Sequence, residues 1–231
     1  IDNNEEEIVS CYRVKSFILG NTGKNKLAQA ELNKLLIYKL KPKNEVLILQ
    51  SLAHSYDREA KYSKSITLLE KVIELCEKYN IENIKPLVYN SMGISYFNIG
   101  ENSKALYYFK VALEGEKILY NKISYSANIA ISYFNLGKYD NAKNYNDKAS
   151  TLLKNSFSKE LLVHVSSQGA LLMQAIGDID GSIRLSEKIY DIAEKNNDLI
   201  HLWFINDYLF LNYYYKNDQE NCLKFLDKNR T

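Results

Sequence analysis

Three histidines are the side chains of this chain best suited to bind a transition metal. His54, His164 and His201 lie far apart in the sequence. No two of them have the i, i+4 spacing that would place both imidazoles on one face of a helix, so a zinc site is not expected. No other cofactor-binding pattern occurs, and we predict that the protein binds no cofactor.

The candidate nucleophiles are also isolated. Cys11, Cys76 and Cys222 have no CxxC spacing, and their odd number argues against a closed set of disulfides, so we interpret them as buried free thiols. No GxSxG, GxxxxGK[ST] or GxGxxG motif occurs, which removes the usual signatures of acyl transfer, nucleotide hydrolysis and dinucleotide binding. We therefore expect that the protein is not an enzyme.

The composition is that of an ordinary water-soluble, helical protein. The 30 Lys and Arg residues nearly balance 28 Asp and Glu residues, so we do not expect direct binding to nucleic acid. No apolar run of about 18 residues could span a bilayer and no signal-peptide pattern is present, so we expect a cytoplasmic protein without membrane contact. Only 9 Gly and 2 Pro residues occur, which favours helices.

An apolar pattern repeats along the chain. In the clearest copy, large and small residues recur at Tyr89, Met92, Gly93, Tyr96, Gly100, Ala105, Phe109 and Ala112. Two amphipathic helices joined by a tight turn at Gly100 would produce this pattern. A downstream copy has Ile129, Ala130, Tyr133, Gly137, Tyr139, Ala142 and Ala149, and an upstream copy has Leu52, Ala53, Tyr56, Ala60, Tyr62, Ser65, Leu69 and Val72.

The pattern resembles the tetratricopeptide repeat, whose signature Gly93, Tyr96, Ala105, Phe109 and Ala112 match at five positions. Weaker copies extend the resemblance over nearly the whole chain. About six repeats are predicted, at approximately residues 9–45, 46–85, 86–122, 123–162, 163–202 and 203–231. Their spacing of roughly 37 to 40 residues exceeds the usual 34, which we interpret as about one extra helical turn per hairpin.

This resemblance implies an all-α fold, a right-handed superhelical α-solenoid built as a single repeat domain over residues 1–231. Small residues such as Gly93, Ala130 and Ala53 are expected where helix backbones approach closely, with tyrosines filling the space beside them. Because the chain opens with Ile1 and closes at Thr231 directly after a helix, we expect an excerpt of a longer protein.

In tetratricopeptide proteins the first helix of each hairpin lines a concave groove. The resemblance implies that the residues facing this groove include Gln50, His54, Asn90, Ile94, Phe97, Asn98, Ile131, Phe134, Asn135, Leu171 and Gln174. The amides could clamp an extended peptide backbone and the apolar side chains could form pockets, or the apolar side chains could merely seal adjacent helices. Family members that hold a C-terminal carboxylate use cations at such positions. Almost none occur here, so a carboxylate clamp is not expected.

The long repeats and groove asparagines resemble the peptide-sensing regulators of Gram-positive bacteria, of the PlcR, NprR, Rap and Rgg type. That resemblance implies a regulatory domain that binds a short oligopeptide in quorum sensing and controls transcription, with homodimerisation as one mode of assembly. Two alternatives stay open: a constitutive protein–protein adaptor without a small ligand, and the sensor segment of a larger signalling enzyme.

Overall fold

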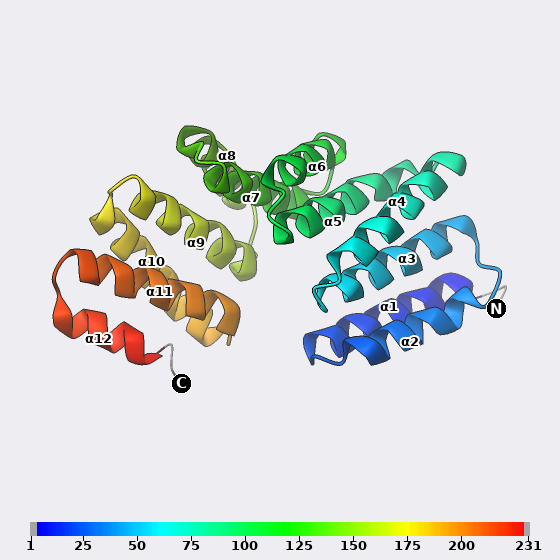
Figure 1. The fold of residues 1–231 in the computed structure, drawn as a ribbon, viewed down its shortest axis with the longest axis horizontal. Helices are drawn as coiled ribbons and strands as arrows, with labels where there is room; N and C mark the ends of the chain where they lie inside the picture. Colours follow the sequence, from blue (N-terminus) through cyan, green and yellow to red (C-terminus); the bar gives the residue numbers. More distant parts are fainter. Residues whose placement is uncertain (1–3, 229–231) are drawn as a thin grey trace. The chain divides into compact units, whose positions relative to one another are not determined.

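The computed structural model describes residues 4–228, which form twelve α-helices and no β-strand (Figure 1). Consecutive helices pair into six helix–turn–helix hairpins, which confirms the predicted all-α fold of tetratricopeptide-like repeats. Within this described range, no helix combines the length and the apolar character needed to cross a membrane.

The hairpins fall into two compact units of three hairpins each, Ile1–Gly115 (unit 1) and Glu116–Thr231 (unit 2). Unit 1 contains α1 (Glu5–Asn21), α2 (Asn25–Leu36), α3 (Pro42–Asp57), α4 (Tyr62–Lys78), the short 3₁₀ helix η1 (Glu82–Ile84), α5 (Lys85–Asn98) and α6 (Asn102–Gly115). Unit 2 contains α7 (Leu119–Asn135), α8 (Tyr139–Leu153), α9 (Lys159–Ala175), α10 (Ile179–Lys195), α11 (Leu199–Tyr215) and α12 (Gln219–Lys228).

Most hairpins begin earlier than the sequence pattern predicted. The first begins at Glu5 and the second at Pro42, ahead of the predicted residues 9 and 46. The third begins at Lys85, close to the predicted residue 86, and its first helix has only 14 residues against 17 in α1. The additional turn therefore lies at the N-terminal end of the first helix, ahead of the signature residues that define the repeat.

The apolar core of each unit is shared between neighbouring hairpins. In unit 1, Val9, Leu32 and Ile48 join the first hairpin to the second, and a second cluster that includes Leu69 and Met92 joins the second to the third. Unit 2 has two similar clusters. Because one hairpin cannot bury its apolar face alone, each hairpin is stable only against its neighbours.

A residue with positive φ lies in the turn within every hairpin. Glycine occupies this position in four turns, at Gly23, Gly100, Gly137 and Gly177. Ala60 and Asn217 take it in the other two. Since a Cβ atom is disfavoured at positive φ, Ala60 marks a strained turn between α3 and α4.

Gly93 was expected to allow two helix backbones to approach closely, and the structure gives a different reason for this glycine. A methyl group added at Gly93 would lie 2.5 Å from ring atoms of Phe109, which is buried in α6 of the same hairpin. Gly93 therefore makes room for an aromatic ring rather than for a neighbouring backbone. Beside it, Tyr96 stacks on Tyr108 with ring centroids 5.4 Å apart.

The prediction that all three cysteines are buried thiols is wrong for two of them. Cys76 is free and buried, but Cys222 is only partly buried and Cys11 is exposed on α1. The weak repeat signal in the first hairpin gave no means of placing Cys11 on the outer face.

Candidate functional site

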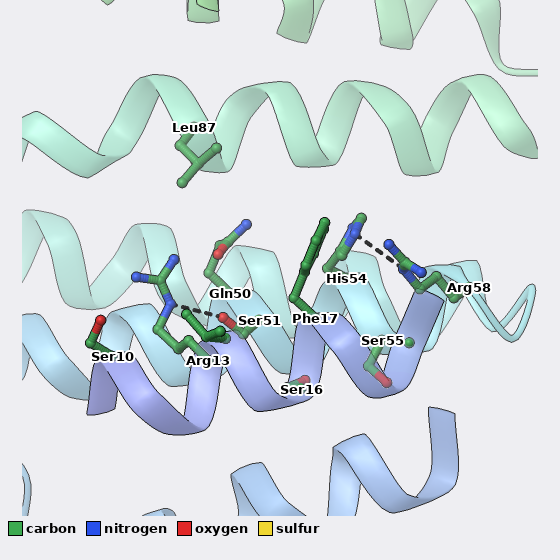
Figure 2. Close-up of a pocket in the computed structure, with 12 residues that line it drawn as sticks. Ser10, Arg13, Ser16, Phe17, Gln50, Ser51, His54, Ser55, Arg58 and Leu87 are labelled. Carbon is green, nitrogen blue, oxygen red and sulfur yellow. Dashed lines mark hydrogen bonds between the residues drawn. The ribbon is translucent and has the colours of Figure 1, made fainter. Parts of the chain in front are cut away.

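A cavity of about 370 Å³ lies over the first helices of the three hairpins of unit 1 (Figure 2). We call it the α1–α3 pocket, because α1 and α3 supply ten of its twelve lining residues. These residues are Ser10, Arg13, Val14, Ser16, Phe17 and Gly20 from α1, Gln50, Ser51, His54, Ser55 and Arg58 from α3 and the turn that follows it, and Leu87 from α5.

Helical spacing brings the polar side chains of the pocket into line. Gln50, His54 and Arg58 are each four residues apart, so they lie along one face of α3 and the start of the next turn. Arg13 and Phe17 have the same spacing on α1 and face this row. The pocket therefore forms because two adjacent inner helices each place polar or aromatic residues four positions apart, on the faces that line the cavity.

Most of the polar side chains that line the α1–α3 pocket make a hydrogen bond within the protein, but the two arginines use only a small part of their donors. Arg13 donates from Nε to Ser51 Oγ at 3.0 Å, and Arg58 donates from Nε to His54 Nε2 at 3.3 Å. Gln50 donates from Nε2 to Ser91 Oγ at 3.3 Å. Each guanidinium carries five N–H donors, so these contacts leave most of the donors of both arginines available.

The electrostatic character of the pocket is cationic. Its twelve lining residues include two arginines and no carboxylate. Burial lowers the pKa of Arg13, and burial together with the nearby Arg58 lowers the pKa of His54, which favours a neutral imidazole that accepts the hydrogen bond from Arg58. The fixed positive charge of the pocket therefore comes from the arginines.

The structure brings only two of the predicted site residues, Gln50 and His54, into this pocket. The other four in unit 1 lie on α5: Asn90 is buried, Ile94 and Phe97 are partly buried, and Asn98 is exposed near the end of the helix. None of the four lines the pocket.

The five predicted residues of unit 2 lie on α7 and α9. Ile131 and Phe134 are partly buried, and the Phe134 ring contacts that of Tyr139 at a centroid distance of 5.5 Å. Asn135 is exposed, while Leu171 and Gln174 are partly buried. Their role as peptide contacts stays a prediction.

Sequence reasoning missed Arg13, because the first repeat is too degenerate to assign groove positions within it. A usable signal was present in the choice of cation. Only four arginines occur among the 30 basic residues, and two of them line this one pocket. Arginine differs from lysine in its planar fork of five N–H donors, which suits recognition of planar polar groups.

In unit 2, two histidines that are far apart in sequence meet between α9 and α11. His164 Nδ1 lies 3.3 Å from His201 Nε2, and His201 Nδ1 lies 2.8 Å from Asp198 Oδ2. Gln168 Nε2 lies 3.4 Å from the remaining ring nitrogen of His164. One set of neutral tautomers satisfies all these contacts, so all four ring nitrogens of the two histidines have a partner within the protein.

This histidine pair does not extend to a larger ligand set. Across residues 4–228, no group of three or more His, Cys, Asp or Glu side chains is arranged to hold a metal ion. Burial and the neighbouring His201 lower the pKa of His164 to about 4, so this imidazole is neutral near pH 7.

Comparison with known proteins supports the fold and goes no further. No family model and no curated protein sequence matches the chain. Among solved structures, a Rap protein in complex with Competence and Sporulation Factor superposes with a TM-score of 0.77 at 14% identity, covering 98% of this chain and 66% of that one. The apo quorum sensor NprR from B. thuringiensis gives 0.76 at 16% identity, covering 96% and 63%.

A kinesin light chain repeat protein from P. anserina also matches, with a TM-score of 0.66 at 12% identity over 86% of this chain and all of that one. The chain therefore has a tetratricopeptide-type solenoid fold that resembles Rap and NprR. It spans about two thirds of the length of those two regulators.

Proposed function

We propose that this chain is a peptide-binding regulatory domain and that a short, extended peptide binds along the inner helices, with the α1–α3 pocket of unit 1 as one contact. The observation that carries the proposal is the pocket itself, where apolar walls stand beside two arginines that each use one N–H donor in a hydrogen bond within the protein. Such a mixture suits a peptide, because side chains fill the apolar part and the backbone uses the polar part.

The neighbouring structures support this choice. The NprR fold matched here was solved in complex with its cognate peptide NprX, and the Rap fold in complex with Competence and Sporulation Factor. By analogy we propose a cytoplasmic quorum-sensing role in a Gram-positive bacterium, with no catalytic activity in this chain and with transcription as the regulated output.

Native mass spectrometry of the full chain purified from a cell extract tests this proposal. A bound peptide of several residues supports it, and a co-purifying protein without any peptide contradicts it. The eluted peptide is then titrated by calorimetry into wild type, Gln50→Ala and Asn135→Ala. Asn83→Ala, on the exposed segment between α4 and α5, is the matched control. Unchanged affinity in both test variants would count against the assigned contacts.

A constitutive adaptor is the second candidate, and one observation favours it. α11 exposes four large apolar residues within two turns: Leu199, Ile200, Trp203 and Phe204. A helix that is apolar on all sides is normally covered, so this face could bind a folded partner. Replacing Trp203 with Glu should then abolish co-purification of that protein, and unchanged co-purification would count against this face as the binding surface.

A further inference from the structure

The two arginines of the α1–α3 pocket have no counter-ion. Arg13 is half-buried, and no carboxylate of the described residues lies within ion-pair distance of either Arg13 or Arg58. Two other cations of unit 1, Lys15 and Lys34, both contact Glu31, at 2.9 Å and 2.6 Å. Lys15 lies two residues from Arg13 on the same helix, so α1 has an acid beside its cation on one side and none on the pocket side.

A half-buried guanidinium without a counter-ion is unfavourable unless a ligand completes it. Removing the charge from water has a cost, and a single hydrogen bond to Ser51 offsets only part of it. An anionic ligand group explains why arginine is present.

The pocket also holds Arg58 in place. The Arg58 guanidinium lies 5.6 Å from the centre of the Phe17 ring, in a cation–π arrangement. A methyl group added at Gly20 would lie 3.2 Å from Arg58 Cδ, so glycine at this point of α1 lets the arginine side chain lie across the helix. Arg58 is thereby oriented at one end of the cavity, while Arg13 lies further along it (Figure 2).

Apolar side chains lie directly beside these cations. Val14 and Phe17 are both more than half exposed on α1, and Leu87 lines the same cavity from α5. A small inorganic anion would leave this apolar surface uncovered. A carboxylate attached to an aliphatic side chain would fill both parts of the cavity.

We propose that the α1–α3 pocket binds a peptide carboxylate next to an aliphatic side chain, with Arg13 as the main anchor and Arg58 as the second donor. This inference rests on the proposed peptide-binding function and names the chemistry of one contact. The carboxylate is the free C-terminus or an acidic side chain of the peptide. Guanidinium groups bind either source through paired N–H donors.

Small probes separate this inference from peptide binding in general. The full chain, with its arginine side-chain Nε–H groups observed by NMR, is titrated with N-acetyl-leucine, with N-acetyl-leucinamide, with N-acetylglutamic acid α-amide and with inorganic phosphate. We expect N-acetyl-leucine to shift the Arg13 and Arg58 signals, and N-acetyl-leucinamide, which differs only in lacking the charge, to leave them unchanged. The glutamic acid derivative shows whether a side-chain carboxylate binds as well as a C-terminal one.

Variants assign the contact. Arg13→Gln should weaken binding of N-acetyl-leucine about tenfold, and Arg58→Gln severalfold because Arg58 is more exposed. Arg184→Gln, an exposed arginine on α10, is the matched control and should have no effect. Before any probe is added, arginine signals that are well separated from one another show that a variant is folded. The same spectra therefore report on folding.

Three results would overturn the inference: equal shifts with the amide, unchanged affinity in Arg13→Gln, or tighter binding of phosphate than of either carboxylate. None of them bears on whether a peptide co-purifies with the chain, so failure of the carboxylate assignment is distinguishable from failure of the proposed function.

Discussion

One set of polar groups on the inner helices of unit 1 and one set on those of unit 2 are arranged in opposite ways. In unit 1, Arg13 and Arg58 face a cavity without a carboxylate partner. In unit 2, the rings of His164 and His201 contact each other, and Asp198 contacts the other ring nitrogen of His201. The same architecture therefore carries one set of polar groups that is completed only by a ligand and another that is complete within the protein.

This difference shows how a repeat fold can use different polar residues for ligand binding and for stability. Polar groups that are paired internally fix one hairpin against the next, whereas unpaired groups add little to stability and remain available for recognition. Substitutions should consequently lower stability in unit 2 and lower ligand affinity in unit 1.

The largest expected effect on stability concerns the packing of an inner helix against its neighbours within each unit. Gly93→Ala should destabilise the protein by about 3 kcal/mol, because the new methyl group would overlap the buried Phe109 ring. Gly169→Ala in α9 is the matched change in unit 2. There the methyl group would meet Asn146 Nδ2 at 3.0 Å, and a side-chain end can move, so we expect a loss of about 1 kcal/mol or less. Urea unfolding measures both, and equal losses would contradict the difference in packing.

The pH dependence of local stability should have opposite signs in the two units. Burial raises the pKa of Asp57 to about 6, above its unfolded value of 3.8, so the folded state binds the extra proton and unit 1 gains stability as the pH falls through 6. The pKa of His164 is about 4, below its unfolded value of 6.5, so unit 2 loses stability as the pH falls below 6.5. Between pH 7 and pH 5 the gain in unit 1 amounts to about 1 kcal/mol and the loss in unit 2 to about 2 kcal/mol.

Hydrogen exchange, corrected for the intrinsic rate at each pH, measures these two trends in separate peptides of α3 and α9. Asp57→Asn retains an acceptor for Ser95, whose hydroxyl donates to Asp57 at 2.8 Å, and should flatten the trend in unit 1. His164→Gln should flatten the trend in unit 2. Parallel trends in both units would refute the opposed signs.

A smaller loss of stability is expected from removing the Asp198 carboxylate in unit 2. Asp198→Ala should cost about 1–2 kcal/mol, because Asp198 caps α11 by accepting from the His201 backbone N–H and also contacts the His201 ring. Asp198→Asn keeps a cap and should lose about half as much. Thermal unfolding distinguishes the two variants. An Asp198→Ala variant with unchanged stability would show that the hydrogen bonds among Asp198, His201 and His164 have no structural role.

The smallest effect on stability is expected at the unpaired cation. Arg13→Met should change the free energy of unfolding by less than about 1 kcal/mol, and in the stabilising direction, because it removes a half-buried charge and keeps the stem. Lys15→Met, on the same helix, breaks the ion pair with Glu31 and should be mildly destabilising. A clear loss of stability in Arg13→Met would mean that Arg13 serves the fold rather than a ligand.

Much of the fold could be predicted from sequence because the repeat signature is local. Gly100, Phe109 and Ala112 report on one hairpin, and the same spacing recurs in the next. The start of each first helix could not be placed as well, since the additional turn carries no signature residue.

The candidate site was harder to predict, because it depends on contacts between hairpins. Gln50 and His54 were predicted from their groove positions, but Arg13 lies in the hairpin whose signature is weakest. The meeting of His164 with His201 depends on how α9 packs against α11 and has no counterpart in sequence spacing.

The central claim is that unit 1 offers its inner polar groups to a peptide while unit 2 uses its own for stability. Photo-crosslinking of a pool of short random peptides that contain photoleucine, followed by mass spectrometry of the cross-linked chain, tests it most directly. The account predicts cross-links on the residues of α1, α3 and α5 around the α1–α3 pocket, and their loss in Arg13→Gln for peptides with free carboxylates. Cross-links confined to α9 and α11, unchanged by Arg13→Gln, would contradict it.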